Sequence, residues 1–228
     1  MSHFLYTETC PKCRKNGHDI AGDNLAVYSD NHKWCYRCGY FEPGDIAHKI
    51  NKPIVNSKGL LYPDIVPLSE ECLEYLDKFN LTREEIYDNL NGHEDGYSYF
   101  DSKFFLVRRL HKKPKVIVKG EVVGNEPIFA CQEGSNTIVL CEDIISAIKI
   151  SRVKDACALL SNQINGTLLY RLSSRYDNCV LWLDPDMYEH MLKTLLPRVQ
   201  PYFKQVGVIL SGFDPKYYST NEIKERVK

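Results

Sequence analysis

The pattern of apolar and polar positions changes along the chain and divides the sequence into parts with different predicted structures. Residues 97–130 contain short runs rich in aromatic and β-branched side chains ("GYSYF", "KFFLVRRL", "KVIVKGEVV", "IFA"), and these predict strands. Residues 68–76 carry apolar side chains at helical spacing, and Thr82 with Glu85 predicts a capping box for a second short helix. The middle of the chain is therefore expected to be a mixed α+β subdomain.

Beyond residue 130, strand and helix patterns alternate. Strands are predicted in "NTIVLC", "DACALLS", "NCVLWL" and "QVGVILS", and helical patterns follow them, including "LLYRLSSRY" and the closing stretch after "FDPKYYS". Such alternation is typical of an α/β parallel sheet with helices on both faces. In such sheets, ligands bind at the carboxyl ends of the strands.

Composition narrows the class of protein. The 228 residues are 43% hydrophobic, which is enough for a real core, and the formal net charge of −1 gives no global attraction to nucleic acid. No apolar run approaches the roughly 18–20 residues of a membrane span, and the N-terminus lacks the apolar core of a signal peptide. We expect a soluble, cytoplasmic protein without a membrane partner.

The cysteines form a metal-binding pattern near the N-terminus. Nine cysteines are an odd, unevenly spaced set, which argues against a secreted disulfide framework. Two C-x2-C pairs, separated by 21 residues, predict a structural zinc site with four thiolates, held by a small all-β ribbon; the ligands are Cys10, Cys13, Cys35 and Cys38. Because four thiolates saturate the ion, His18 and His32 are not expected to bind it.

Composition also suggests domain boundaries. Residues 42–67 carry four prolines, which is typical of a tether leading to a new domain. The predicted organisation is a zinc ribbon at 1–44, a linker at 45–66, an α+β subdomain at 67–130 and the parallel sheet at 131–228.

A basic segment lies on the predicted strands of the middle subdomain. Between residues 103 and 119, seven lysines and arginines occur without an acidic residue: Lys103, Arg108, Arg109, Lys112, Lys113, Lys115 and Lys119. A solvated face is the ordinary explanation of such a run. In a nearly neutral protein, however, the local excess favours a surface for nucleic acid or polyphosphate.

Acidic residues follow three strands of the predicted parallel sheet. Glu142 ends one strand, Asp184 and Asp186 flank Pro185 after another, and Asp214 follows a third. An isolated "DPD" is usually a turn or helix cap. Three acidic strand ends in one sheet instead predict a Mg²⁺ or Mn²⁺ site, because clustered carboxylates repel unless a cation shares them.

The order of these motifs resembles the TOPRIM domain of topoisomerases, primases and some nucleases. The four-cysteine ribbon in front narrows the resemblance to bacterial-type primases, and "VYSDNHKWCYRC" is similar to the zinc domain of podophage primase–helicases. "VLCEDIISAIKI", "LWLDPDMY" and "FDPKYYS" resemble the three TOPRIM motifs, whereas residues 42–100 match least.

The resemblance implies roles for individual residues. Glu142, Asp184, Asp186 and Asp214 would hold the catalytic metals, and Glu142 could also help activate a 3′-hydroxyl. Arg108, Arg109 and Lys119 would face the template or a nucleoside triphosphate. Asp30 and His32 would belong to the template-reading surface of the ribbon, and Trp34 is a candidate for base stacking or for the core.

Two positions depart from the TOPRIM pattern. Asp143 stands where the family usually has a glycine, and Ser146 stands where it usually has an aspartate. The chain also contains no P-loop motif, so a separately encoded replicative helicase is expected as a partner.

The leading hypothesis is a DNA primase that makes short RNA primers from ribonucleoside triphosphates on a single-stranded DNA template. Two alternatives remain. A recombination-mediator DNA-binding protein can also pair a four-cysteine site with a TOPRIM domain, although that family begins with a helix-hairpin-helix. A TOPRIM nuclease would share the acidic residues but seldom has such a ribbon.

Overall fold

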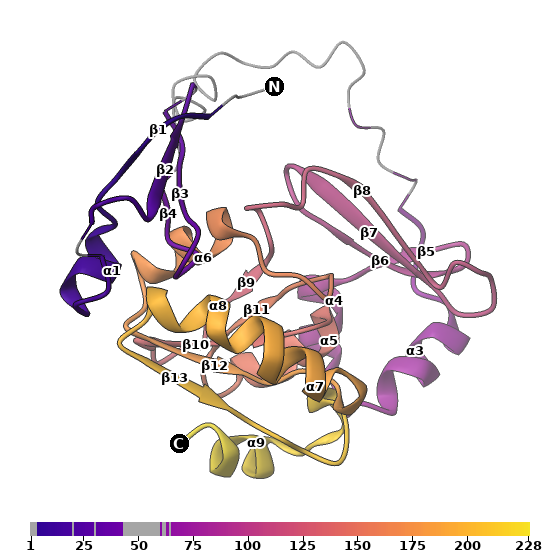
Figure 1. The fold of residues 1–228 in the computed structure, drawn as a ribbon. Coiled ribbons are helices and arrows are strands. Elements are labelled where there is room, and N and C mark those ends of the chain that lie inside the picture. Colours follow the sequence, from indigo (N-terminus) through magenta and orange to yellow (C-terminus); the bar gives the residue numbers. More distant parts are fainter. Residues whose placement is uncertain (1–3, 20, 30, 43–59, 61–62, 64) are drawn as a thin grey trace.

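The computed structural model describes residues 4–19, 21–29, 31–42, 60, 63 and 65–228, and these residues form three sheets (Figure 1). Two four-stranded sheets are antiparallel, and the third has five strands of which four run parallel. The predicted α/β class with a small all-β ribbon is confirmed. In the part of the chain that the structure describes, no helix is long and apolar enough to cross a bilayer.

The N-terminal ribbon is a four-stranded meander. Its strands are β1 (Phe4–Glu8), β2 (Leu25–Tyr28), β3 (Lys33–Cys35) and β4 (Phe41–Glu42), and the short helix α1 (Pro11–Lys15) follows β1. Strands β2 and β3 pair in an antiparallel hairpin, with Leu25 opposite Cys35. The predicted linker at 45–66 lies almost entirely outside the described residues.

The middle of the chain folds as two helices followed by an antiparallel sheet. Helix α3 (Glu70–Asp77) begins after the Ser69 cap, two residues later than the apolar pattern, and α4 (Arg83–Asn89) begins with the predicted Thr82–Glu85 capping box. The sheet contains β5 (Asn91–His93), β6 (Gly96–Phe100), β7 (Phe104–Arg109) and β8 (Val116–Gly120) in chain order. The predicted strands of this region are therefore confirmed.

The C-terminal sheet has the strand order β13-β12-β10-β11-β9. Its parallel strands are β10 (Thr137–Cys141), β11 (Asp155–Ala158), β12 (Asn178–Leu181) and β13 (Gln205–Val208), and β9 (Ile128–Phe129) adds an antiparallel edge. The parallel sheet was predicted, and the antiparallel edge strand is an addition to that prediction.

Helices cover both faces of this sheet, as the alternation of side chains along β10 requires. Val139 and Cys141 pack in the core shared with α5 (Ile144–Ser151) and α9 (Thr220–Arg226), whereas Ile138 and Leu140 face α6 (Gly166–Ser173). The latter core also contains residues of the segments between Asp184 and Phe203. These segments are the 3-10 helix η1 (Pro185–Met187), α7 (Tyr188–His190), the π-helical η2 (Met191–Leu195), α8 (Leu196–Val199) and the 3-10 helix η3 (Gln200–Tyr202).

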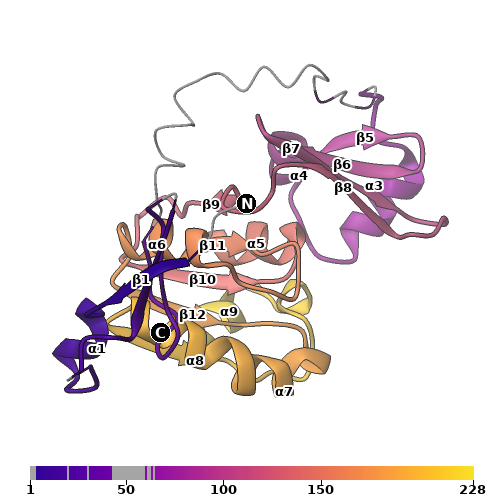
Figure 2. The ribbon, with the colours of Figure 1, turned by 45° about the horizontal axis from the view of Figure 1, so that its top comes forward.

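The middle subdomain and the parallel sheet share one hydrophobic core. Tyr97 and Leu106 of the antiparallel sheet belong to the same buried cluster as Ile145 and Ile148 of α5. Arg152 extends this contact, because its guanidinium makes two hydrogen bonds of 2.6 Å to Glu85 of α4. Figure 2 shows the β5–β8 sheet beside α5, on the side of the molecule away from the ribbon.

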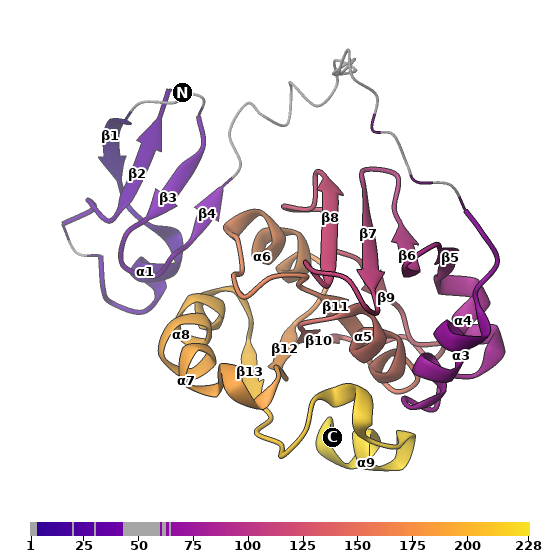
Figure 3. The ribbon, with the colours of Figure 1, turned by 90° about the vertical axis from the view of Figure 1, so that its right-hand side faces the viewer.

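The ribbon lies against α6 and α8 on the opposite side (Figure 3). Phe41 of β4 packs so closely on Gly166 that a Cβ atom there would lie 2.8 Å from the Phe41 Cβ. The hydroxyl of Tyr202 donates a hydrogen bond to the Gly39 carbonyl, and the Lys12 ammonium lies 4.1 Å from the Tyr202 ring centre. The ribbon is thus docked on the same chain that carries the acidic residues.

Candidate metal centres and nucleic-acid interface

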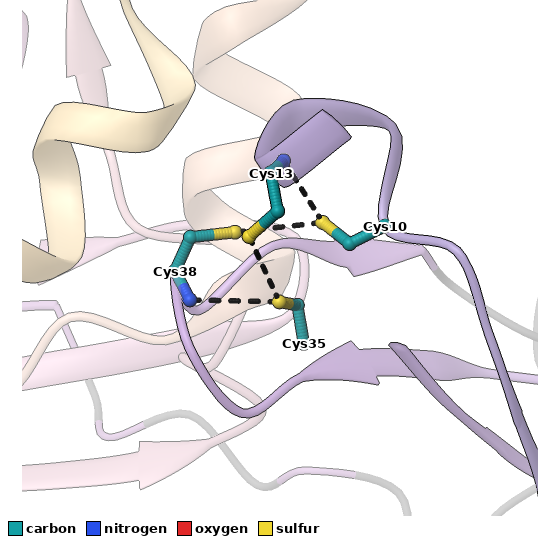
Figure 4. A group of neighbouring side chains, drawn as sticks. All are labelled: Cys10, Cys13, Cys35 and Cys38. Atoms are coloured by element: carbon teal, nitrogen blue, oxygen red, sulfur yellow. Dashed lines mark hydrogen bonds between the residues drawn. The ribbon is translucent and has the colours of Figure 1, made fainter. Parts of the chain in front are cut away.

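The four predicted zinc ligands converge at one end of the ribbon (Figure 4). Their Sγ atoms all lie within 4.8 Å of one another, and the Cys10–Cys38 and Cys13–Cys35 sulfurs are 3.6 Å apart. Tetrahedral coordination at about 2.3 Å per bond requires sulfurs about 3.8 Å apart, so the observed spacing fits zinc. The group of side chains that could hold the ion consists of these four cysteines and includes neither His18 nor His32.

Backbone hydrogen bonds orient these sulfurs. The amides of Cys13 and Cys38 each donate to the sulfur three residues earlier in their own C-x2-C turn, at 3.5 Å. The buried Asp19 accepts hydrogen bonds from the amides of Cys10 and Asp23, and so ties the first turn to the loop that leads to β2. Sequence reasoning missed Asp19, which carries no spacing signal of its own.

The predicted reading surface of the ribbon is aromatic. His32 stacks on Tyr28 with ring centres 4.1 Å apart and planes 8° apart. Trp34 lies edge-on to Phe41, and the guanidinium of Arg198 from α8 lies 5.7 Å from its ring centre. Trp34 is therefore part of the contact between the ribbon and α8, whereas Asp30 lies outside the described residues.

Three of the predicted acidic residues meet at the carboxyl edge of the parallel sheet. Glu142 directly follows β10, and Asp184 and Asp186 belong to the turn after the neighbouring strand β12. Parallel neighbours end at the same edge, which brings their carboxylate oxygens within 4.8 Å of one another. The amide of Asp184 donates to Oε1 of Glu142 at 3.3 Å and fixes the two strand ends together.

The electrostatics of this acidic triad (Glu142, Asp184 and Asp186) favour a bound cation. Burial raises the pKa of Glu142, and the neighbouring carboxylates add to the effect. Burial also raises the pKa of Asp184 to about 7, against the opposing effect of Lys216. Oδ1 of Asp184 is buried without a hydrogen-bond partner, and such an orphaned acceptor is costly unless an ion binds it. An all-oxygen donor set with a vacant buried lone pair fits Mg²⁺ or Mn²⁺.

Asp214 lies in the same region but bonds to a lysine. It precedes the 3-10 helix η4 (Pro215–Tyr217), and its Oδ2 lies 2.7 Å from Nζ of Lys216. Burial lowers the pKa of Lys216, yet the carboxylates of Asp143, Asp214 and Asp184 outweigh burial and hold that pKa above its ordinary value. Sequence reasoning missed Lys216, although "DPK" in the third acidic loop was the available signal.

Asp143, which departs from the TOPRIM pattern, has a local structural role. Its Oδ1 accepts the Ser146 amide at 3.0 Å and so caps α5, and its Oδ2 accepts the Ser146 hydroxyl at 2.9 Å. The same Oδ2 lies 3.1 Å from the Lys216 ammonium. Asp143 and Ser146, the two residues that depart from the TOPRIM pattern, therefore bond to each other.

The basic segment divides between the two faces of its sheet. Arg108 lines a cavity of about 70 Å³ together with Asp143 and Lys216, next to the acidic triad. Arg109 points away from it and pairs with Asp95 at 3.2 Å, and Lys112 pairs with the same carboxylate at 2.6 Å. The remaining lysines of the segment are exposed: Lys103, Lys113, Lys115 and Lys119. Arg108 is thus the residue of the segment that borders the acidic site.

Comparison with solved structures identifies the class of fold. No protein-family profile and no curated protein sequence matches the chain. The primase fragment of the bacteriophage T7 primase-helicase protein is 17% identical, with a TM-score of 0.50, over 99% of this chain and 100% of that chain. The zinc-binding and RNA polymerase domains of the Aquifex aeolicus primase are 13% identical, with a TM-score of 0.53, over 99% of this chain and 78% of that chain. The chain therefore has the fold of bacterial and phage primase fragments.

Proposed function

We propose that the protein is a DNA primase, a nucleotidyltransferase that makes short RNA primers on single-stranded DNA from ribonucleoside triphosphates. The observation that carries the proposal is the acidic triad at the carboxyl edge of a parallel sheet, in a chain whose whole length shares the primase fold. The docked ribbon and the basic strand next to the triad supply the surfaces that such an enzyme needs.

The acidic triad would be the catalytic centre. Glu142, Asp184 and Asp186 would hold a Mg²⁺ or Mn²⁺ ion, which when bound supplies a Lewis acid for phosphoryl transfer. Glu142, whose pKa is raised, would accept the proton of a 3′-hydroxyl through the oxygen that does not bond to the Asp184 amide. Asp214 was predicted as a further metal ligand, and its role remains a proposal.

The basic segment would bind the template and the nucleotide. Arg108 borders the acidic site and would contact phosphate oxygens there. The exposed lysines would neutralise template phosphates, which makes binding sensitive to salt. Arg109 and Lys112, which pair with Asp95, would act mainly by shaping this surface.

The ribbon would select the start site on the template. Zinc would hold the C-x2-C turns, and Asp30, His32 and Trp34 would lie on or beside the surface that meets the bases. A separately encoded replicative helicase would deliver single-stranded DNA. Primer synthesis would take place in the cytoplasm of a bacterium, which would be an infected host if the protein is phage-encoded. The T7 fragment that shares the fold comes from a primase-helicase protein.

The test is primer synthesis on unprimed single-stranded DNA of random sequence, with four ribonucleoside triphosphates, one of them labelled, and Mg²⁺. We expect short labelled oligoribonucleotides from the wild type and none from Asp184→Ala. Asp177→Ala is the matched control, because Asp177 lies before β12 and pairs only at the surface with Lys204.

The same reactions separate the alternatives. Degradation of the template that depends on Asp184 would replace the primase with a TOPRIM nuclease. If the wild type and Asp184→Ala both bind DNA but neither makes a labelled oligoribonucleotide, even after a replicative helicase is added, the result would favour a recombination mediator.

A further inference from the structure

Five carboxylates surround the acidic site, and they divide into two groups around one lysine. Glu142, Asp184 and Asp186 form the acidic triad. Asp214 and Asp143 instead bond to the Lys216 ammonium, at 2.7 and 3.1 Å. The ammonium also lies 4.0 Å from Oδ2 of Asp184, so it borders the triad directly.

The position of Lys216 is fixed from both ends of its side chain. Its backbone carbonyl accepts a 2.9 Å hydrogen bond from Nζ of Lys149, a fully buried lysine of α5. At the other end, Asp143 is held by two hydrogen bonds from Ser146. Only 16% of the Lys216 side chain is exposed. These contacts hold the ammonium between Asp143 and Asp214, next to the acidic triad.

This arrangement limits how many metal ions the site can hold. An ion ligated by Asp214 and Asp143 would have to occupy the volume of the ammonium, because the same oxygens bond to it. An ion in the acidic triad meets no such obstacle, since Asp184 presents a buried oxygen without a partner. Asp143 and Lys216 thus complement each other, and both line the cavity that Arg108 borders.

We propose that the Lys216 ammonium occupies the place of a second metal ion, so that the site binds one divalent cation, in the acidic triad, and Asp143 and Asp214 hold the lysine. Lys216 is then a positioning residue that supplies a fixed positive charge next to the metal. The next step rests on the proposed primase function. The Lys216 ammonium and the Arg108 guanidinium would face the phosphates of the incoming nucleotide from two sides.

The test counts bound Mn²⁺ on the zinc-loaded protein, by the loss of the free-ion electron paramagnetic resonance signal. We expect one Mn²⁺ for the wild type, one for Lys216→Arg, which keeps the charge, and two for Lys216→Met, which frees Asp143 and Asp214. Two ions bound to the wild type, or one bound to a folded Lys216→Met variant, would overturn the proposal. Thermal unfolding establishes whether each variant is folded.

A second pair of variants tests the same idea without removing the lysine. We expect Asp214→Asn to change the Mn²⁺ dissociation constant by less than about threefold, and Asp186→Asn to raise it by about tenfold or more, since affinity follows the number of charged ligands. Equal weakening by both variants would make Asp214 a ligand and refute the assignment. Because these readouts need no primer synthesis, failure of the primase function and failure of this proposal are distinguishable.

Discussion

The contact between Phe41 and Gly166 offers a single-atom test of ribbon docking. Gly166 is the first residue of α6, directly after the Asn165 cap, and Phe41 lies on the ribbon strand β4. An alanine Cβ at residue 166 would lie 2.8 Å from Cβ and 3.0 Å from Cγ of Phe41. These are the inner atoms of the phenylalanine side chain, so β4 itself must move.

Gly166→Ala is expected to change two quantities in opposite directions. Overpacking costs about 1–3 kcal/mol, which lowers the ratio of docked to undocked ribbon by about 5- to 150-fold. The same substitution favours the helical backbone of α6 by up to about 1 kcal/mol, because alanine has a higher helix propensity than glycine. The parallel sheet should therefore stay folded while the ribbon leaves it.

Intrinsic fluorescence measures both quantities. The chain has two tryptophans: Trp182 is fully buried in the core, and Trp34 lies at the contact with α8. Acrylamide quenching should rise in Gly166→Ala because undocking exposes Trp34, while urea unfolding reported by Trp182 should keep or raise its midpoint. Gly207→Ala is the matched control, because a Cβ there meets Val180 at an ordinary 3.5 Å. Unchanged quenching in a folded Gly166→Ala protein would refute the docked geometry.

Three further perturbations test other parts of the structure. Cys35→Ser should abolish zinc binding and raise amide exchange across β1–β4 but not β10–β13, whereas Cys131→Ser, outside the cluster, should keep one zinc per chain. Arg152→Ala should cost about 2–3 kcal/mol in urea unfolding, because the half-buried Glu85 carboxylate loses its two hydrogen bonds from the guanidinium and keeps that from the Thr82 amide; an effect below about 0.5 kcal/mol would contradict this. Burial lowers the pKa of Lys149 to about 8, with Arg152 adding to the effect and Glu85 and Glu222 opposing it, so the unfolded chain holds more protons between about pH 8 and 10.5. The free energy of unfolding of the wild type relative to Lys149→Met should therefore rise by about 2–3 kcal/mol over that range. The same pH dependence of that free energy in both proteins would show that the charge of Lys149 does not affect stability.

Local sequence patterns predicted the elements whose signals lie within the element itself. The capping box at Thr82 is a three-residue signal, and the continuous apolar run of β10 is typical of a strand that is buried on both faces of a parallel sheet. Strand β1 was missed because Phe4, Leu5 and Tyr6 are all exposed, so no alternation marks it. Its formation depends on pairing with β2.

The helix expected after the acidic turn forms, but its hydrogen-bonding pattern changes along its length, because 3-10, α-helical and π-helical turns follow one another without a gap from Pro185 to Tyr202. Pro197 and Pro201 lack the amide hydrogens that a continuous α-helix needs, and the chain passes through π-helical and 3-10 turns around them. The sequence showed both prolines, but not how the chain would arrange its remaining hydrogen bonds.

The candidate site could be predicted only in part. Parallel topology places Glu142 and Asp184 at one edge once the strands are assigned, and the C-x2-C spacing defines the cysteine cluster. The bond between Lys216 and Asp143 spans 73 residues, and whether a lysine or a metal balances the carboxylates depends on the η4 turn. Similarly, Arg108 and Arg109 are adjacent in sequence, but the strand turns only Arg108 toward the acidic site.

The proposed primase joins ribonucleotides at the acidic triad without a pre-existing primer. A γ-labelled ribonucleoside triphosphate tests this most directly, because only the first nucleotide of a newly started chain keeps its γ-phosphate. On unprimed single-stranded DNA with Mg²⁺, we expect γ-labelled dinucleotides and longer products from the wild type and from Asp177→Ala, and none from Asp184→Asn. Two results would contradict this expectation. One is that Asp184→Asn gives as much γ-labelled product as the wild type, and the other is that products carry label from an α-labelled nucleotide but none from the γ-labelled one.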